Sequence, residues 1–204
     1  MSSKLQWVGW GTLIVFPVLG ALLLFLFGKP VAAVMFRSEI NVVLQIGAGG
    51  FIGTLLGLGG RWIITRPIIL PSLDKYAHIV KSMRLKTQHV YFLSFCAGFG
   101  EELFFRGAMQ PLTGIWIAAI FFVAIHGYLN PYKWRISIYG IYMTLSIALL
   151  GYLTEIWGIF TACAAHMAID VVLFNFLIRF ADEKIAYENS YEESSDEIET
   201  DVEP

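Results

Sequence analysis

The sequence has few charged residues, few cysteines and none of the short motifs that mark many soluble enzymes. Only 15% of its 204 residues are charged, whereas 57% are apolar, a balance outside that of ordinary soluble domains. The two cysteines, Cys96 and Cys163, lie in separate apolar runs, so their spacing indicates neither a disulfide framework nor a zinc knuckle. A glycine-rich phosphate loop, a His-Glu-x-x-His zinc motif and a basic-aromatic surface for nucleic acid are absent from the sequence. The composition therefore predicts an integral membrane protein.

Apolar runs of membrane-spanning length recur along the chain and predict its fold class. A spanning helix needs about 20 apolar residues. We therefore expect an all-α, polytopic bundle of about six transmembrane helices, with one amphipathic interfacial helix over residues 67–86. A polar connector that packs under the bundle is the alternative for that segment. The six predicted spans are Leu5–Phe27, Ile40–Gly60, Thr87–Gln110, Thr113–Tyr132, Ile136–Thr154 and Ile156–Ile178.

Glycines recur at a regular spacing in the second predicted span. Gly49, Gly53 and Gly57 are four residues apart, a spacing that lets two helix backbones approach closely in lipid. We expect this face of the span to pack against another helix.

Charge is distributed unevenly along the chain. Ten of the 16 acidic residues and one of the 14 basic residues lie between Asp182 and Pro204. The other basic residues outside the spans cluster in alternate connecting segments, with only Lys29 and Arg37 on the opposite side. The positive-inside rule then places both termini in the cytoplasm. We divide the chain into a membrane domain, residues 1–181, and an acidic cytoplasmic tail, residues 182–204, which is expected to be disordered.

Six ionisable side chains lie deep within the predicted spans. Charge at that depth costs several kcal/mol, so such residues usually have a function. They are Glu101, Glu102 and Arg106 in the third span, His126 in the fourth, and His166 and Asp170 in the sixth.

Helical geometry predicts how these side chains are grouped. Residues four apart share a helix face, so Glu102 can pair with Arg106 and His166 with Asp170, while Glu101 points elsewhere. At about 1.5 Å per residue, four of these side chains lie roughly 12–20 Å below the outer ends of their spans. They are Glu101, His126, His166 and Asp170. A carboxylate and imidazoles that meet in one layer suit a hydrolytic centre that activates water.

The same residues resemble the three motifs of the CAAX protease and bacteriocin-processing family of intramembrane proteases, also called CPBP or Abi. The ordered set covers about a third of the chain and is more specific than any one motif. The matching residues are Glu101-Glu102 followed after three residues by Arg106, Phe122 four residues before His126, and His166 four residues before Asp170.

The family resemblance implies roles for these residues. It implies Glu101 as the base that activates water and His126 as its partner. It implies that His166 and Asp170 stabilise the oxyanion or position water. A support role follows for Glu102, Arg106 and Phe122.

The last motif departs from the pattern of the prenyl-processing members, which typically have asparagine where this chain has Asp170. An aspartate donates a hydrogen bond to an oxyanion only when it is protonated. Alternatively, His126, His166 and Asp170 are candidate ligands of a divalent metal such as zinc, with Glu101 as the base. The resemblance favours a mechanism without metal.

The predicted function is an intramembrane endopeptidase of CAAX type or for bacteriocin or peptide processing. Its partners are then membrane lipid and a peptide or protein substrate at the membrane, with no nucleic acid. The resemblance suggests a prokaryotic inner membrane. A proton-coupled transporter is one alternative, although the sequence shows no internal repeat of the kind that transporters carry. A catalytically silent protein that binds a membrane partner is the other.

Overall fold

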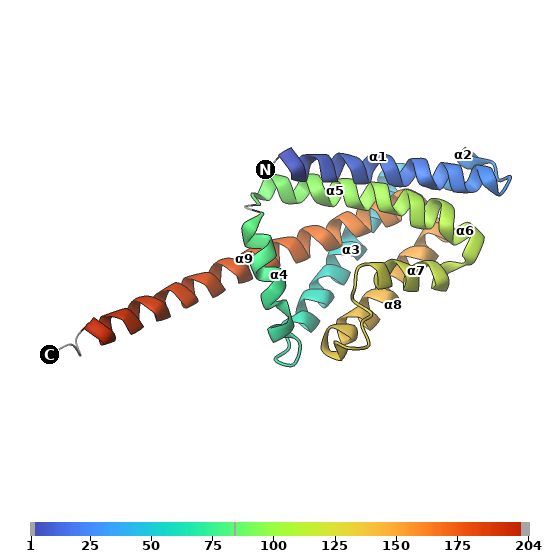
Figure 1. Cartoon of the computed structure of the whole chain (residues 1–204). Helices are drawn as coiled ribbons and strands as arrows, with labels where there is room; N and C mark the ends of the chain where they lie inside the picture. The colour runs from blue at the N-terminus through green and yellow to red at the C-terminus, as the bar shows by residue number, and fades with distance from the viewer. Residues whose placement is uncertain (1–2, 84, 201–204) are drawn as a thin grey trace.

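The chain is folded from helices throughout the part that the structure describes. A computed structural model describes residues 3–83 and 85–200 and is drawn in Figure 1. All regular elements in these residues are helical, which confirms the predicted all-α class. In chain order they are α1 (Ser3–Leu26), α2 (Val31–Met35), α3 (Val42–Ile64), the 3-10 helix η1 (Leu70–Leu73), α4 (Asp74–Ser82), α5 (Thr87–Phe104), the π-helix η2 (Phe105–Met109), α6 (Gln110–Thr113), α7 (Ile115–Ile125), α8 (Trp134–Trp157) and α9 (Ile159–Thr200).

Four helices are long and apolar enough to cross a membrane, namely α1, α3, α8 and the part of α9 up to Tyr187. These confirm four of the six predicted spans. The predicted fourth span is too long, because α7 has only 11 residues and ends at Ile125. Gly127 follows with a positive φ of 78°, a conformation with which helices commonly end. At about 1.5 Å per residue α7 covers about 17 Å, roughly half of the hydrocarbon core.

The predicted third span also differs in its local structure. It is divided into α5, the π-helix η2 and the short α6. Single-turn π segments inside α-helices are rare and often occur at functional sites. Here the π segment begins three residues after Glu102 and contains Arg106.

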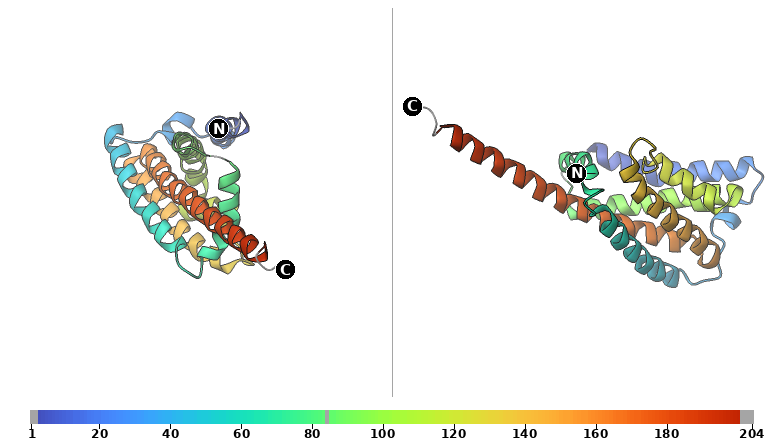
Figure 2. Two further views of the ribbon diagram at one scale, coloured as in Figure 1. Left: turned by 90° about the vertical axis from the view of Figure 1, so that its left-hand side faces the viewer. Right: turned by 90° about the horizontal axis from the view of Figure 1, so that it is seen from below.

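The long helix α9 runs through the bundle and packs against both α3 and α5, while α1 lies alongside α5 (Figures 1 and 2). The amino terminus, α4 and the projecting part of α9 lie towards one end of the molecule, and α2 and α6 lie at the other (Figure 1). The main buried core lies among η2, α7, α8 and α9 and contains Phe105, Phe122, Ile147 and Ile169.

Glycines let α9 approach two of its neighbours closely. A Cβ atom on Gly53 of α3 would lie 2.1 Å from the carbonyl oxygen of Ala165. A Cβ atom on Gly98 of α5 would lie 2.8 Å from the carbonyl oxygen of Cys163. A side chain at either position would force the helix backbones apart, as in other close helix pairs. The expected packing of the glycine face is confirmed, and Gly98 brings α5 against α9 one turn before Glu102.

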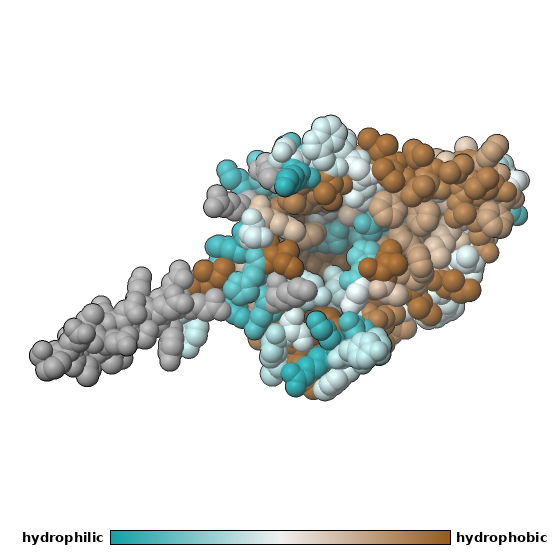
Figure 3. Space-filling view, viewed as in Figure 1, coloured by the Kyte–Doolittle hydropathy of each residue, from teal (hydrophilic) through white to brown (hydrophobic). Residues whose placement is uncertain are grey.

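Hydrophobic side chains face outwards on the candidate spans. In α1, Trp7 and Phe25 are 74% and 73% exposed, and Trp62 of α3 is 62% exposed. Figure 3 shows hydrophobic residues over much of one end of the molecule, and a hollow in the middle of this face with hydrophilic residues inside it. Large exposed apolar surfaces mark contact with a membrane or a partner. The exposed helices therefore have the surface that a lipid environment requires.

The connector between α3 and α5 packs under the bundle. Its helical part comprises η1 and the nine-residue α4, so the amphipathic helix predicted over residues 67–86 is confirmed only in part. Leu73 and Val80 are buried, and α4 packs against α9. This contact is the one expected from the alternative, a packed connector. Arg84, one of its predicted basic residues, lies outside the described residues.

The helix α9 continues as far as Thr200, whereas the sequence predicts disorder from Asp182 onwards. Two ion pairs hold the start of this segment against α4. Asp182 pairs with Lys81, and Lys184 Nζ lies 2.6 Å from Asp74 Oδ1. These contacts extend the packed part of α9 beyond the predicted boundary. The last four residues lie outside the described part, and the division of the chain at residue 181 stays a prediction.

Candidate active site within the bundle

The structure brings together all six ionisable side chains that the sequence singles out. Ion-pair contacts between 2.8 and 3.7 Å connect each of them to at least one other. The first group comes from α5 and η2, and the others come from the end of α7 and from the buried part of α9. The residues are Glu101, Glu102 and Arg106, then His126, and then His166 and Asp170.

Glu101 and His126 form the more open part of the site. Glu101 Oε2 lies 3.6 Å from His126 Nε2, and their side chains are 15% and 33% exposed. This separation is longer than a direct hydrogen bond. Glu101 Oε2 is buried and has no hydrogen-bond partner among the protein atoms of the described residues. The pair therefore has bonding capacity left for a small polar molecule such as water.

The backbone determines which nitrogen of His126 faces Glu101. His126 caps the end of α7, and its Nδ1 lies 2.7 Å from the carbonyl oxygen of Phe122. A carbonyl oxygen only accepts hydrogen bonds, so Nδ1 carries the proton and donates it. In the neutral ring Nε2 then has a free lone pair towards Glu101. Nε2 of His126 and Oε2 of Glu101 are then both hydrogen-bond acceptors, 3.6 Å apart. A water molecule can donate one hydrogen bond to each of them.

Glu102 is the centre of the more closed part of the site. Its side chain is fully buried, with Oε2 3.0 Å from Arg106 Nε and Oε1 2.8 Å from His166 Nδ1. The pair with Arg106 was expected from their spacing. The bond to His166 was not, because it joins α5 to α9 across 64 positions of sequence. Glu102 therefore holds His166 in place as well as neutralising Arg106.

His166 and Asp170 lie on one stripe of α9, as their spacing predicts. His166 Nε2 is 3.7 Å from Asp170 Oδ2, and the aspartate side chain is 22% exposed. The imidazole is thus placed between two carboxylates, with Glu102 on Nδ1 and Asp170 near Nε2. Because Glu102 bonds Nδ1, Nε2 is the ring nitrogen left to face a reacting group.

Phe122 packs against several of these groups at once. Its ring stacks on His126 with centroids 4.4 Å apart and meets His166 edge-on at 5.5 Å. The guanidinium of Arg106 lies 4.9 Å from the same ring, within the range of a cation–π contact. This packing limits the positions that both imidazoles can take.

The part of the chain that contains the candidate site is similar to a known protein family. Residues 84–172, which contain every one of these side chains, match the sequence model of the family described as Type II CAAX prenyl endopeptidase Rce1-like. This segment is similar to the domain that defines that family. The resemblance that the three sequence motifs suggest is therefore confirmed. Residues outside the Rce1-like domain, including α1 to α4 and the end of α9, are not part of the match.

One curated relative supports the assignment. The uncharacterized protein YpbD of Bacillus subtilis (strain 168) is 40% identical over 95 residues, which are 45% of this chain and 47% of YpbD. The chain thus spans about half the length of the curated relative that it matches. No solved structure matches the chain.

The metal alternative can be tested against the donor atoms of the Rce1-like domain. Within the described residues, no group of three or more His, Cys, Asp and Glu side chains is arranged to hold a metal ion. His126 Nδ1 is bound to a backbone carbonyl and His166 Nδ1 to Glu102. Such Nδ1 bonds leave Nε2 available and are also common in histidines that bind metal, so His126, His166 and Asp170 as metal ligands stay a prediction, and no step is derived through a metal.

Two residues near the site were not predicted from the sequence. Tyr128 stacks on the ring of His126 with centroids 6.1 Å apart and packs edge-on against Tyr139. It lies four residues before the end of the predicted fourth span, where aromatic residues commonly mark the membrane interface, so the sequence gave no separate signal for it. Gln110 donates to the carbonyl oxygen of Gly151 at 3.0 Å. Its position four residues after Arg106 was a usable signal, because the two share a helix face.

Proposed function

We propose that the chain is an intramembrane endopeptidase in which Glu101 activates the water that hydrolyses a peptide bond. The observation that carries this proposal is the 3.6 Å contact between Glu101 Oε2 and His126 Nε2, with the His126 tautomer held by a backbone carbonyl. The Rce1-like match supports it, since the family comprises glutamate-type intramembrane endopeptidases.

The proposed reaction starts from a water molecule in contact with both Glu101 and His126. Glu101 takes one proton from this water, and the resulting hydroxide adds to the carbonyl carbon of the scissile bond. His126 Nε2 accepts a hydrogen bond from the second hydrogen, which stays on the oxygen, and so orients the attacking lone pair. When the tetrahedral intermediate collapses, the protonated Glu101 returns its proton to the leaving nitrogen, which completes hydrolysis without any other reactant.

His166 is proposed to stabilise the negative oxygen of that intermediate. Nδ1 of His166 is bonded to Glu102 at 2.8 Å. When His166 is protonated, its Nε2–H lies beside Asp170 and is the donor available to the oxyanion. A donor held in place before the reaction stabilises developing charge more effectively than a mobile one. Glu102, Arg106 and Phe122 would then act as positioning residues for the two imidazoles.

Two adjoining cavities form a possible route for a substrate to the site. The route starts at the end of the bundle that carries most of the basic residues. A cavity of about 590 Å³ lies between η1–α4 and the start of α8, and a smaller one of about 60 Å³ lies deeper. Tyr76 and Ile136 line both, and Tyr128 beside His126 lines the deeper one. We infer that the substrate is a peptide that enters from this end, which the charge distribution assigns to the cytoplasm. The bacterial relative fits the proposed prokaryotic membrane.

Peptide cleavage by the purified full-length protein tests the proposal. A peptide with a prenylated carboxyl-terminal cysteine and the same peptide without the prenyl group serve as substrates, and products are measured by mass spectrometry. We expect cleavage by the wild type and a loss of about 10²- to 10⁴-fold in kcat/KM for Glu101→Gln, as for removal of a general base. Glu39→Gln, a glutamate in the exposed loop before α3, is the matched control and should cleave like the wild type.

Full activity of Glu101→Gln would contradict the proposal. The transporter would be favoured if the wild type did not cleave the peptides but drove proton-coupled uptake of a solute into proteoliposomes, and if Glu101→Gln abolished that uptake. If neither the wild type nor Glu101→Gln cleaved peptide or took up solute, and both gave the same cellular phenotype, a silent partner-binding protein would be favoured.

A further inference from the structure

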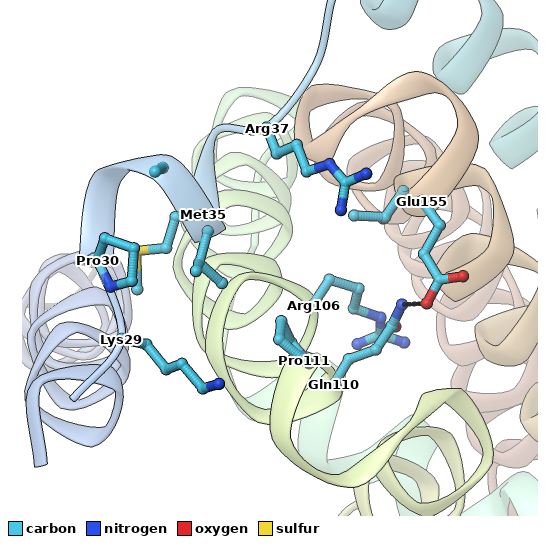
Figure 4. A pocket seen from close by; sticks show the side chains of 11 residues that line it. Lys29, Pro30, Met35, Arg37, Arg106, Gln110, Pro111 and Glu155 are labelled. Atoms are coloured by element: carbon cyan, nitrogen blue, oxygen red, sulfur yellow. Dashed lines mark hydrogen bonds between the residues drawn. The ribbon is translucent and has the colours of Figure 1, made fainter. Parts of the chain in front are cut away.

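A large cavity lined by both charged and apolar residues lies at the opposite end of the bundle from the cytoplasmic side assigned by charge. It has a volume of about 700 Å³ and is bounded by the α1–α2 turn, the segment after α2, η2–α6 and the end of α8 (Figure 4). This volume is within the range of small-molecule sites. The polar side chains that line it are Lys29, Arg37, Arg106, Gln110, Thr154 and Glu155.

The charges around this cavity are predominantly positive. Lys29 and Arg37 form no ion pair among the described residues. Arg106 is 1% exposed, and its Nη1 is buried without a hydrogen-bond partner among the protein atoms of the described part. Its partner Glu102 is shared with His166. Glu155 is the one acidic residue in the lining, and its Oε1 accepts a hydrogen bond from Gln110 at 3.2 Å.

The backbone holds the two exposed cations at the cavity. Gly28 ends α1 with a positive φ of 65°, and the amide of Lys29 donates to the carbonyl oxygen of Leu24 at 2.9 Å. Arg37 follows α2, whose last turn is closed by a bond from the Phe36 amide. The cations therefore project from short, hydrogen-bonded turns. Figure 4 shows Lys29, Arg37 and Arg106 placed around the same space.

We propose that this cavity binds a phosphate group. Arginine presents several N–H donors in a fork that matches phosphate oxygens, and lysine adds a point charge. The buried cation of Arg106, whose Nη1 lacks a partner, is the feature that a chance grouping of surface charges would not have. The phosphate can belong to an anionic lipid headgroup or to a free ion, because both present the same oxygens.

The site is separate from the proposed proteolytic reaction. Lys29 and Arg37 lie outside residues 84–172, the segment that matches the Rce1-like family. The cavity and the proposed active site share only Arg106, whose Nε lies 3.0 Å from Glu102 Oε2 and which also lines the cavity. Binding at the cavity therefore needs no cleavage activity and is tested without it.

Isothermal titration of the full-length protein in a nonionic detergent tests the inference. The probes are inorganic phosphate, dioctanoyl phosphatidylglycerol and dioctanoyl phosphatidylcholine. We expect saturable binding of at least one anionic probe, weakened about tenfold or more in Lys29→Gln/Arg37→Gln, because two charge-assisted contacts are removed. Glu155→Gln should strengthen binding, since it removes the opposing charge. Arg61→Gln/Arg179→Gln, two arginines near the other end of the bundle, is the matched control and should bind like the wild type.

The pattern among the probes identifies the source of the phosphate. Binding of inorganic phosphate alone indicates a free ion, and binding of phosphatidylglycerol but not phosphatidylcholine indicates an anionic headgroup. Absence of binding of both anionic probes overturns the inference. Equal losses in the cavity and control variants, or weaker binding by Glu155→Gln, also overturn it.

Discussion

Glu101 and Glu102 are adjacent in sequence but differ in burial and in the distances to their ionisable partners. Glu102 is fully buried and has charged partners at 2.8 and 3.0 Å. Glu101 is 15% exposed, and its nearest ionisable partner lies 3.6 Å away. Their side chains diverge because consecutive helical residues point about 100° apart, so one faces α9 and the other the end of α7.

The contrast separates two functions within one helix turn. A buried carboxylate with two close partners has little freedom, so Glu102 can fix the positions of Arg106 and His166. A carboxylate with a long contact and unused hydrogen-bonding capacity can exchange protons, as the proposed role of Glu101 requires. We therefore expect substitutions at Glu102 to act mainly on stability and those at Glu101 mainly on chemistry.

The largest expected loss of stability comes from Glu102→Ala. It leaves the buried Arg106 unpaired, and removal of one partner of a buried ion pair costs about 3–5 kcal/mol. Unfolding of the purified protein in mixed detergent micelles measures this loss. Glu102→Leu/Arg106→Met should recover most of it, because the replacement of both charges by apolar groups of similar size is often nearly neutral. A double variant no more stable than Glu102→Ala would show that Glu102 acts through another partner.

An intermediate loss is expected from Gly98→Ala. The added Cβ would meet the backbone of Cys163 at 2.8 Å and of Met167 at 2.9 Å, so α5 and α9 must separate. Overpacking of this kind costs about 1–3 kcal/mol, and the separation lengthens the Glu102–His166 bond. The free energy of unfolding and the cleavage rate should therefore fall together.

Gly47→Ala is the control for this substitution, because a Cβ there has no atom within 4 Å. It should leave both the free energy of unfolding and the cleavage rate near their wild-type values. An effect of Gly47→Ala as large as that of Gly98→Ala would rule out close packing as the cause.

The smallest effect on stability is expected from Glu101→Gln. The change keeps the shape of the side chain and removes a carboxylate whose Oε2 has no hydrogen-bond partner in the described protein. The free energy of unfolding should change by less than about 1 kcal/mol, the scale of an ordinary hydrogen bond, while cleavage is lost. If the loss of stability approached that of Glu102→Ala, the difference between the two glutamates would disappear.

Sequence patterns predicted the local parts of the site well. The spacing of Glu102 and Arg106 and that of His166 and Asp170 placed each pair on one helix face, and the structure has both. The divergence of Glu101 from Glu102 followed from the same geometry. These predictions were possible because each depends on helical periodicity within a few residues.

Features that depend on contacts between distant segments were not predicted. The bond from Glu102 to His166 joins residues 64 positions apart, and the cavity that contains Lys29 and Arg37 is closed by η2, α6 and α8. The early end of α7 was missed because its apolar run continues the pattern of a longer helix. The ion pair of Asp182 with Lys81 on α4 likewise joins residues 101 positions apart.

Composition and helical spacing were thus enough to establish a membrane-embedded α-helical protein, the six ionisable residues at its centre and their pairing along each helix. Their pairing across helices depends on how closely α3, α5 and α9 approach, and this depends on backbone contacts at Gly53 and Gly98. A linear pattern carries no information on such distances, because they arise from the fit of whole helix surfaces.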